Sequence, residues 1–142
     1  MSIRQVSIFI ENQPGKLAEV TDFIAKQQIS MRALSIADTQ DFGIVRIICE
    51  DIDKAVSALK TAEYVHTVTE VFAVELADEA GSLAKVLSVL ATAGIQVEYT
   101  YAFLSTKKEG SAYMIFRVDR NDDAIRALNG AGIHTVTQQE IF

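Results

Sequence analysis

Residues 6–17 of the chain read VSIFIENQPGKL, and the pattern of side chains changes within this stretch. Val6, Ile8 and Ile10 alternate with more polar neighbours, which indicates a half-buried strand. The dipeptide that follows, Pro14-Gly15, breaks a strand and marks a turn. Apolar residues then recur at helical spacing, at Leu17, Val20, Phe23 and Ile24. The stretch therefore predicts a strand, a turn and a helix in that order.

The same pattern returns in residues 72–83, which read FAVELADEAGSL. Gly15 and Gly81 are 66 positions apart, and at this offset the apolar residues of the two stretches coincide. Leu59 matches Leu128 at a larger offset of 69, which indicates a longer hairpin around residues 107–110 of the second copy. The chain is therefore read as a tandem repeat of a unit of about 70 residues. We expect one domain over residues 1–70 and the other over residues 71–142.

Each copy is predicted to run strand, helix, strand, strand, helix, strand. The expected strands of the first copy are 6–10, 29–39, 42–50 and 65–71. Its first helix is expected over 17–24, and its second is a short helix that carries Ala55, Val56 and Leu59 and that either Asp51 or Asp53 can cap. The expected strands of the second copy are 71–76, 95–105, 111–118 and 133–138, and its helices are 83–93 and 122–128. This order is the ferredoxin-like βαββαβ pattern of the α+β class, with both helices on one face of an antiparallel sheet. Because edge strands need cover, the two sheets are expected to pair side by side.

Composition excludes several classes of protein. The chain has 13 Lys and Arg against 19 Asp and Glu, so its net charge of −6 disfavours binding to nucleic acid or to anionic membranes. No apolar run approaches the roughly 20 residues of a membrane span, and the first residues do not resemble a signal peptide. The single cysteine, Cys49, cannot form an intrachain disulfide. These features predict a cytoplasmic protein with neither nucleic-acid nor membrane partners.

No constellation of residues in the sequence predicts catalysis. The only histidines, His66 and His134, both begin an HTVT sequence and are interpreted as equivalent positions on the last strand of each copy. A metal site would need further ligands beside them, and none is evident. Cys49 follows Ile47 and Ile48 and is interpreted as a small buried side chain. We therefore expect no enzyme activity, no metal and no cofactor.

The loops after the first strand of each copy share the pattern Asn/Asp-x-Pro/Ala-Gly-x-Leu, at residues 12–17 and 78–83. With two βαββαβ units around it, this pattern resembles the ACT domain, a small regulatory module that binds amino acids. The resemblance covers essentially the whole chain, which is similar to stand-alone tandem ACT proteins. The second copy departs from the family pattern at Ala80, where proline is usual. The resemblance implies a non-catalytic sensor that binds a small amino acid at the interface between ACT modules.

The loop suits such a ligand chemically. Glycine permits close approach of the backbone, and the N-terminus of the following helix offers N–H groups and partial positive charge to an α-carboxylate. Asn12, Asp78 or strand carbonyls could accept hydrogen bonds from the α-ammonium. In ACT proteins the ligand commonly lies between the first loop of one module and the second strand of its neighbour. By position, the resemblance implies as candidate ligand-binding residues Asn12, Gln13, Pro14, Gly15, Lys16, Leu17, Leu34, Ser35, Ile36, Ala37, Asp78, Ala80, Gly81, Ser82, Leu83, Tyr99, Thr100, Tyr101 and Ala102.

Structural roles remain open for the same residues. Asn12 and Asp78 can cap a turn, Gly15 and Gly81 can supply a turn conformation, and Leu17 and Leu83 fit a core. Tyr99, Tyr101 and Phe103 share a face of one strand and are interpreted first as an aromatic ladder.

An alternative function is a regulatory or interaction subunit of a separate enzyme of amino-acid metabolism, without a ligand of its own. A third reading, a small enzyme of unknown chemistry, lacks any supporting residues. In each case a homodimer is expected, because the remaining sheet edges or faces need a partner.

Overall fold

The structure is a computed structural model that describes residues 2–39, 41–104 and 109–142. These residues form two compact units. One is Arg4–Thr69, and the other is Glu70–Phe142 together with the first residues of the chain up to Ile3.

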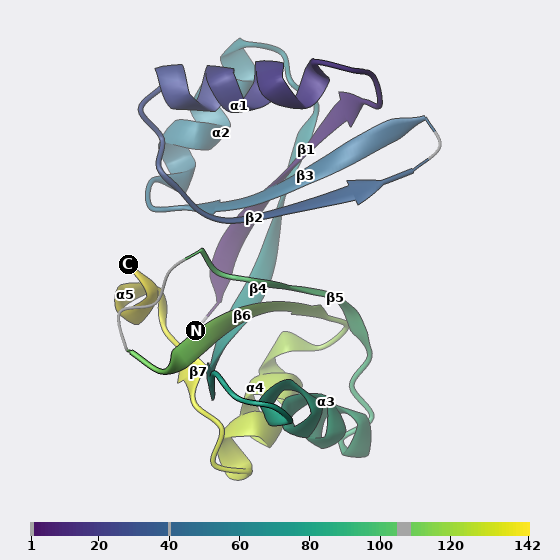
Figure 1. Cartoon of the computed structure of the whole chain (residues 1–142), viewed down its shortest axis with the longest axis vertical. Coiled ribbons are helices and arrows are strands. Elements are labelled where there is room, and N and C mark those ends of the chain that lie inside the picture. Colours follow the sequence, from purple (N-terminus) through teal and green to yellow (C-terminus); the bar gives the residue numbers. More distant parts are fainter. Residues whose placement is uncertain (1, 40, 105–108) are drawn as a thin grey trace. The chain divides into compact units, whose positions relative to one another are not determined.

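The unit Arg4–Thr69 holds the first copy of the repeat. Its elements are β1 (Ile3–Glu11), α1 (Lys16–Lys26), β2 (Met31–Asp38), β3 (Phe42–Cys49), α2 (Ile52–Thr61) and the beginning of β4 (His66–Ala77). The hydrogen-bonded order is β2-β3-β1, with both pairs antiparallel, and β4 lies beside β1. Both helices cover the same face of this sheet (Figure 1).

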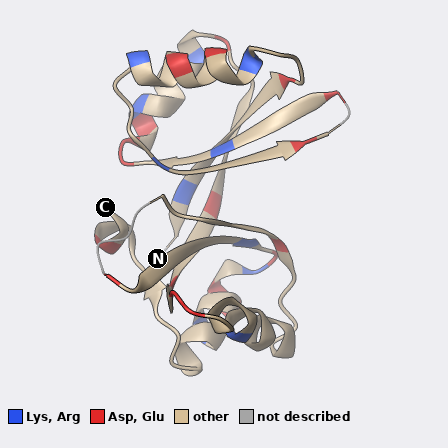
Figure 2. Ribbon diagram, in the orientation of Figure 1, with Lys and Arg blue, Asp and Glu red and all other residues tan. Residues whose placement is uncertain are grey.

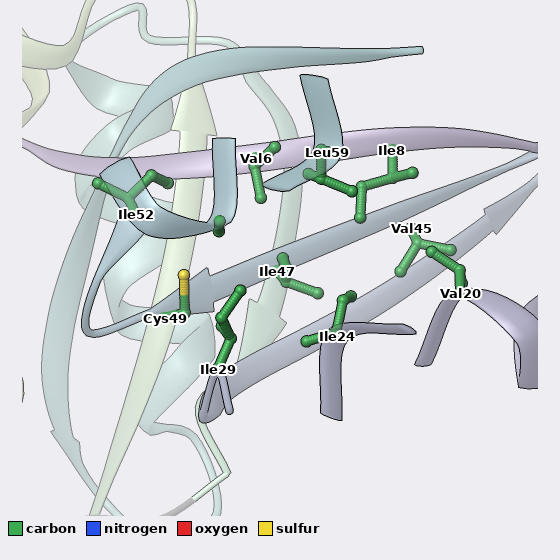
Figure 3. Packing of buried hydrophobic residues seen from close by; sticks show 11 residues of the cluster. Val6, Ile8, Val20, Ile24, Ile29, Val45, Ile47, Cys49, Ile52 and Leu59 are labelled. Atoms are coloured by element: carbon green, nitrogen blue, oxygen red, sulfur yellow. The ribbon is translucent and has the colours of Figure 1, made fainter. Parts of the chain in front are cut away.

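The core of the first copy lies between that face and the two helices. Alternate residues of a strand point to one face, so Val6 and Ile8 of β1 meet Val45 and Ile47 of β3 in the cluster. Figure 3 shows these side chains together with those from the helices. The buried members of the cluster are Val6, Ile8, Val20, Ile24, Ile29, Val45, Ile47, Cys49, Ile52, Ala55 and Leu59.

The second unit repeats this arrangement with a shorter last strand. After β4 come α3 (Ser82–Thr92), β5 (Val97–Ala102), β6 (Ser111–Val118), α4 (Asn121–Gly130), β7 (Thr135–Val136) and α5 (Gln138–Ile141). The strand order is β7-β4-β6-β5, again antiparallel. Its core contains a stacked pair, Phe72 and Phe116, whose ring centroids lie 5.6 Å apart.

The βαββαβ order predicted for each copy is confirmed, and so is the α+β class. The last strand of the second copy is the exception. It was expected over residues 133–138, but β7 ends at Val136 and α5 begins at Gln138. The reason is local: the Thr137 hydroxyl accepts a hydrogen bond from Glu140 N–H, and the Glu140 carboxylate accepts one from Thr137 N–H. This capping box starts a helix where the repeat predicts strand.

The predicted strand 95–105 is described as β5, Val97–Ala102. Ser105 and residues 107 and 108 of the expected hairpin lie outside the described residues. Strand β4 is continuous through the repeat, and its first residues belong to one unit and its remainder to the other.

None of the helices in the described part of the chain has the length and apolar character needed to cross a bilayer.

Candidate functional site

Helix α1 begins at a glycine with an unusual backbone. Gly15 is the N-cap, with φ of 86°, in the left-handed region that residues with a Cβ avoid. Among the described side chains, none caps this helix. The first N–H groups of a helix have no partners within it, and they carry its partial positive charge. The loop therefore ends in a helix N-terminus that can accept an anionic group.

A small pocket lies beside this loop. It has a volume of about 110 Å³. Two of the residues that line it form a hydrogen bond: the Asn12 side-chain amide donates from Nδ2 to Oδ1 of Asp38 at 2.7 Å. Strand register explains why residues 26 positions apart meet, because Asp38 pairs with Gly43 and Gly43 pairs with Ile10. The pocket is lined by Ile10, Glu11, Asn12, Gln13, Leu17, Ile36, Ala37, Asp38 and Gly43.

The pocket contains part of the candidate set from the sequence. It brings together Asn12, Gln13 and Leu17 of the loop and helix with Ile36 and Ala37 of β2. Pro14 and Gly15 shape the turn without lining the pocket. Lys16 forms an ion pair with Glu19, at 3.7 Å between Nζ and Oε2, and lines a separate pocket with Tyr64.

Leu34 and Ser35 lie further along β2, on opposite faces of the strand. Leu34 pairs with Ile47 and packs on the core of the first copy, whereas Ser35 pairs with Arg46 and points the other way.

The candidate residues chosen from the sequence omit Asp38, which lines the pocket, and include Ser35, which does not. The sequence contained a pattern that could have identified Asp38. Leu34, Ile36 and Asp38 alternate along one strand, so all three share the face that carries the loop. The missing information was the register of β2 against β3 and of β3 against β1, which brings Asp38 beside the loop.

In the second copy, Gly81 is likewise the N-cap of α3, with φ of 91° and no cap among the described side chains. The N–H of Asp78 donates to the carbonyl of Gly110 at 2.9 Å. Ser82 lines a pocket of about 240 Å³ together with Glu79, Lys85 and His134. The second loop is thus folded like the first but has different side chains around it.

Strand register also shows which residues of β5 correspond to those of β2. In the first copy, Leu34 of β2 pairs with Ile47 of β3, and Ile47 pairs with Val6 of β1. In the second copy, Thr100 of β5 pairs with Phe116 of β6, and Phe116 pairs with Phe72 of β4. Since Val6 and Phe72 are equivalent, Leu34 corresponds to Thr100. Counting on two residues past Ala102, where β5 ends, the position of Asp38 falls on Leu104, which is 64% exposed.

The candidates on β5 divide between the two faces of the sheet. The Thr100 hydroxyl donates to the carbonyl of Ile115 at 2.8 Å, and its cross-strand partner Phe116 belongs to the core under the helices. Tyr99 and Tyr101 flank Thr100 and point to the opposite face, where their rings stack with centroids 6.4 Å apart. Ala102 returns to the face of Thr100 and corresponds to Ile36.

The two histidines are not equivalent, and this corrects the interpretation of HTVT. Phe9 N–H donates to the carbonyl of Val65, and Glu75 N–H, at the position equivalent to Phe9, donates to the carbonyl of His134. His134 therefore corresponds to Val65. Each histidine has a local partner: His66 Nδ1 lies 2.8 Å from the carbonyl of Tyr64, and His134 Nε2 lies 3.1 Å from Glu140 Oε2.

Cys49 is buried at the end of β3, and its sulfur lies among core side chains (Figure 3). Burial, with a smaller effect of the Asp51 carboxylate, raises the pKa of the Cys49 thiol to about 11. A thiol with this pKa is protonated at neutral pH and is a poor nucleophile. Within residues 2–39, 41–104 and 109–142, no three His, Cys, Asp or Glu side chains are grouped as metal ligands would be.

Charges elsewhere form local pairs. The Arg4 guanidinium donates to Asp53 at 2.9 Å and lowers the pKa of that carboxyl. The pKa of Glu140 is lowered, first by the backbone hydrogen bond from Thr137 and then by His134. Along α1 the acidic residues Glu19 and Asp22 lie between the basic residues Lys16 and Lys26 (Figure 2), which is unlike the basic face of a nucleic-acid binder.

Comparison with known proteins agrees with this architecture. Residues 1–141 match the family model described as "ACT domain pair". Among solved structures, protein BT0572 from Bacteroides thetaiotaomicron is 36% identical, with a TM-score of 0.90 over 99% of this chain and 96% of that chain. A comparison with curated proteins found no match.

Two more distant structures share the fold. The regulatory subunit of aspartate kinase from Thermus thermophilus, in its ligand-free form, is 19% identical, with a TM-score of 0.62 over 90% of this chain and 91% of that chain. The regulatory subunit from Thermus flavus is 18% identical, with a TM-score of 0.63 over 91% of this chain and 92% of that chain.

Proposed function

This chain belongs to the ACT domain pair family, and from that premise we propose that it is a non-catalytic regulatory protein that binds a small amino acid beside the loop after β1. The observation that carries the proposal is the pocket in which Asn12 and Asp38 meet next to the N-terminus of α1. An amino acid needs a site with donors for its carboxylate and acceptors for its ammonium. Helix N–H groups and the Asp38 carboxylate supply one of each.

Binding would have a regulatory consequence through simple linkage. A ligand that binds only the folded protein stabilises it by an amount that grows with the logarithm of the ligand concentration above Kd. If two conformations of the loop or of its neighbouring strands bind with different affinity, the ligand also shifts the balance between them. A protein of this kind needs no catalytic residues of its own.

The first test is a thermal-shift screen of the purified chain against the twenty amino acids, followed by calorimetry on each hit. We expect a saturable rise in Tm with one amino acid or a few chemically similar ones. A screen in which none of the twenty raises Tm or releases heat would overturn the proposal.

Two variants test the loop itself. Asn12→Ala removes the side chain that donates to Asp38, and Gly15→Val places a β-branched residue at φ of 86°. Asn12→Ala is expected to weaken binding by about tenfold, equivalent to the loss of one hydrogen bond of about 1.4 kcal/mol. Gly15→Val is expected to weaken binding because the turn before α1 becomes strained. Circular dichroism is expected to show a largely intact fold. If calorimetry gives unchanged affinity in both variants, the loop is not part of the site.

The alternative function is a regulatory subunit that docks on a separate enzyme of amino-acid metabolism. It is supported by the shared fold of two chains that are regulatory subunits of aspartate kinase. Co-purification with such an enzyme, without binding of any amino acid by the isolated chain, would favour it over the sensor.

We also propose a homodimer. Within its own unit, β2 pairs with β3 and β5 pairs with β6, so each has one edge that faces away from its sheet. Such edges are commonly covered by a second chain. Light scattering during gel filtration would show twice the 15.6 kDa of one chain, and the monomer mass at micromolar concentration would contradict the proposal.

A further inference from the structure

We propose that the outward face of α3, together with the groove between α3 and α4, is a surface on which a second copy of the chain is seated. This inference does not depend on the binding of an amino acid. It also differs from the homodimer proposed above from the sheet edges, because the contact is made by a helix face. The observations that carry it come from comparing α3 with α1, its equivalent in the first copy.

Helix α1 has the outward face of a solvated helix. Lys16 forms an ion pair with Glu19, and Lys26 forms one with Asp22 at 2.9 Å between Nζ and Oδ2. All four of these side chains are exposed. Covering them would remove charges from water, which is unfavourable unless every charge keeps a partner. The face of α1 is therefore poorly suited to a contact with another protein.

Helix α3 has lost most of these charges. At the offset of 66, three of the four charged residues of α1 are replaced by uncharged ones, in the pairs Lys16 and Ser82, Asp22 and Ser88, and Lys26 and Thr92. Lys85 is the single charged residue of α3. Leu87 stands at the position of Thr21 and is 36% exposed. The centres of protein interfaces are depleted of charge in the same way, and exposed apolar residues gather at them.

A groove of about 380 Å³ lies beside this face, between α3 and α4. The described residues that line it are uncharged, namely Ser88, Val89, Thr92, Ala93, Ala127 and Ala131. The corresponding groove of the first copy, of about 400 Å³, has the longer polar side chains of Gln27 and Lys54 in its wall. The groove of the second copy is therefore the one whose walls suit an apolar side chain from another molecule.

The exposed leucine and the groove belong to the same helix, and this arrangement suits a contact between two identical chains. In a two-fold contact, a residue of one copy meets a second residue of the other, and the reciprocal contact forms at the same time. At 3.6 residues per turn, Leu87 lies on one side of the exposed strip of α3 and Val89 on the groove side, with Ala84 and Ala91 between them. Leu87 of each copy can then enter the groove of the other, while the alanines let the helices approach to roughly 8–10 Å.

The distribution of charge also favours a second copy at this face. The chain has a net charge of −6, yet α1 to α4 contain six basic and five acidic residues. The excess negative charge therefore belongs to the strands and loops. Two copies that met through those segments would bring like charges together, which is unfavourable. A contact through α3, which carries Lys85 and no acidic residue, avoids this repulsion.

The first experiment measures self-association of the full chain by sedimentation over a range of micromolar concentrations. Ala91→Glu places a carboxylate at the centre of the proposed contact, and two-fold symmetry places it there twice. We expect the Kd for association to rise by at least about a hundredfold, because like charges would be buried together. The matched control is Ala25→Glu, which places the same residue at the equivalent exposed position of α1. Its Kd is expected to stay within about twofold of the parent chain.

The outcomes separate this contact from the one at the sheet edges. If Ala91→Glu associates as tightly as Ala25→Glu, the inference is overturned and the sheet-edge homodimer stands. If the parent chain stays at 15.6 kDa throughout, both are overturned. A parent tetramer that Ala91→Glu reduces to a dimer would show that both contacts form.

The second experiment locates the contact without placing a charge in it. Ser88→Cys puts a thiol at the edge of the groove, and Asp22→Cys puts one at the equivalent position of α1. Because Cys49 is buried, a bifunctional maleimide is expected to leave the parent chain without cross-links. We expect covalent dimers of Ser88→Cys to form at least about tenfold faster than those of Asp22→Cys, since association raises the effective concentration of the two thiols. Equal rates in two variants that keep the melting curve of the parent chain would rule out the contact.

Discussion

The two copies of the repeat differ in single residues around the loop after their first strand. The two loops have the same turn, built on Gly15 and Gly81 with nearly the same φ, so backbone geometry does not distinguish them. Side chains do. Asn12 donates to Asp38 in the first copy, and the equivalent residues of the second are Asp78 and Leu104. The same turn therefore carries different side chains in the two copies.

The thiol of Cys49 gives a prediction at this scale. Because burial and Asp51 raise its pKa to about 11, the folded protein at pH 8 holds very little thiolate. We expect alkylation by iodoacetamide at pH 8 to be about a hundredfold slower in the folded chain than in the chain unfolded by urea. The rate in the folded chain should rise as the pH approaches 11. Equal rates in both states would show that the thiol is accessible and ionised.

Secondary-structure elements begin where a local signal and the tertiary context agree. Helix α2 begins with Asp51 as N-cap, whose side chain accepts a hydrogen bond from Lys54 N–H at 3.0 Å. Helix α5 begins at the capping box of Thr137 and Glu140, which ends β7 after two residues. The repeat predicts a longer strand there. The prediction is wrong because a threonine and a glutamate three positions apart form a stronger start signal for a helix than the preceding alternation does for a strand.

At the scale of elements we predict that Asp51→Ala lowers the free energy of unfolding by about 1 kcal/mol, because one N–H of α2 loses its cap. Urea denaturation followed by circular dichroism measures it. Glu50→Ala is the matched control, since Glu50 is an exposed acidic neighbour that lies outside the helix and is not the cap. An equal loss in the two variants would show that charge, not capping, is responsible.

The whole molecule is a tandem repeat in which one strand serves both units. The cores of the two copies use the same positions: Leu59 of α2 corresponds to Leu128 of α4, and both are almost fully buried. Strand β4 continues from one unit into the other, so unfolding either unit releases part of a strand that the other uses. The whole chain is therefore expected to unfold in one cooperative transition.

At this scale we predict that Leu59→Ala and Leu128→Ala each lower the free energy of unfolding by about 2–5 kcal/mol, because each leaves a cavity in a packed core. Urea denaturation is monitored by circular dichroism and by tyrosine fluorescence. Both variants should show a single transition, at the same urea concentration with either signal. A variant with two transitions, in which only one copy unfolds early, would contradict the coupling through β4.

The sequence by itself determined the repeat, the order of the elements, the turn at each loop and most of the core. These features follow from periodicity and from turn residues, which are local signals. Val6, Ile8, Leu59 and Leu128 were all identified as apolar positions of their elements, and all are buried. Ligand binding at the loop stays a prediction that the sequence raised and that experiment has to test.

Only the tertiary structure decided which side chains meet. Asp38 reaches Asn12 because β2 pairs with β3 and β3 with β1 in one register, and that register depends on residues far apart in the chain. Strand pairing also turns Tyr99 and Tyr101 to the opposite face from Thr100 and aligns His134 with Val65. A shift of one residue in a strand exchanges its two faces, so alternation in the sequence leaves open what cross-strand pairing settles.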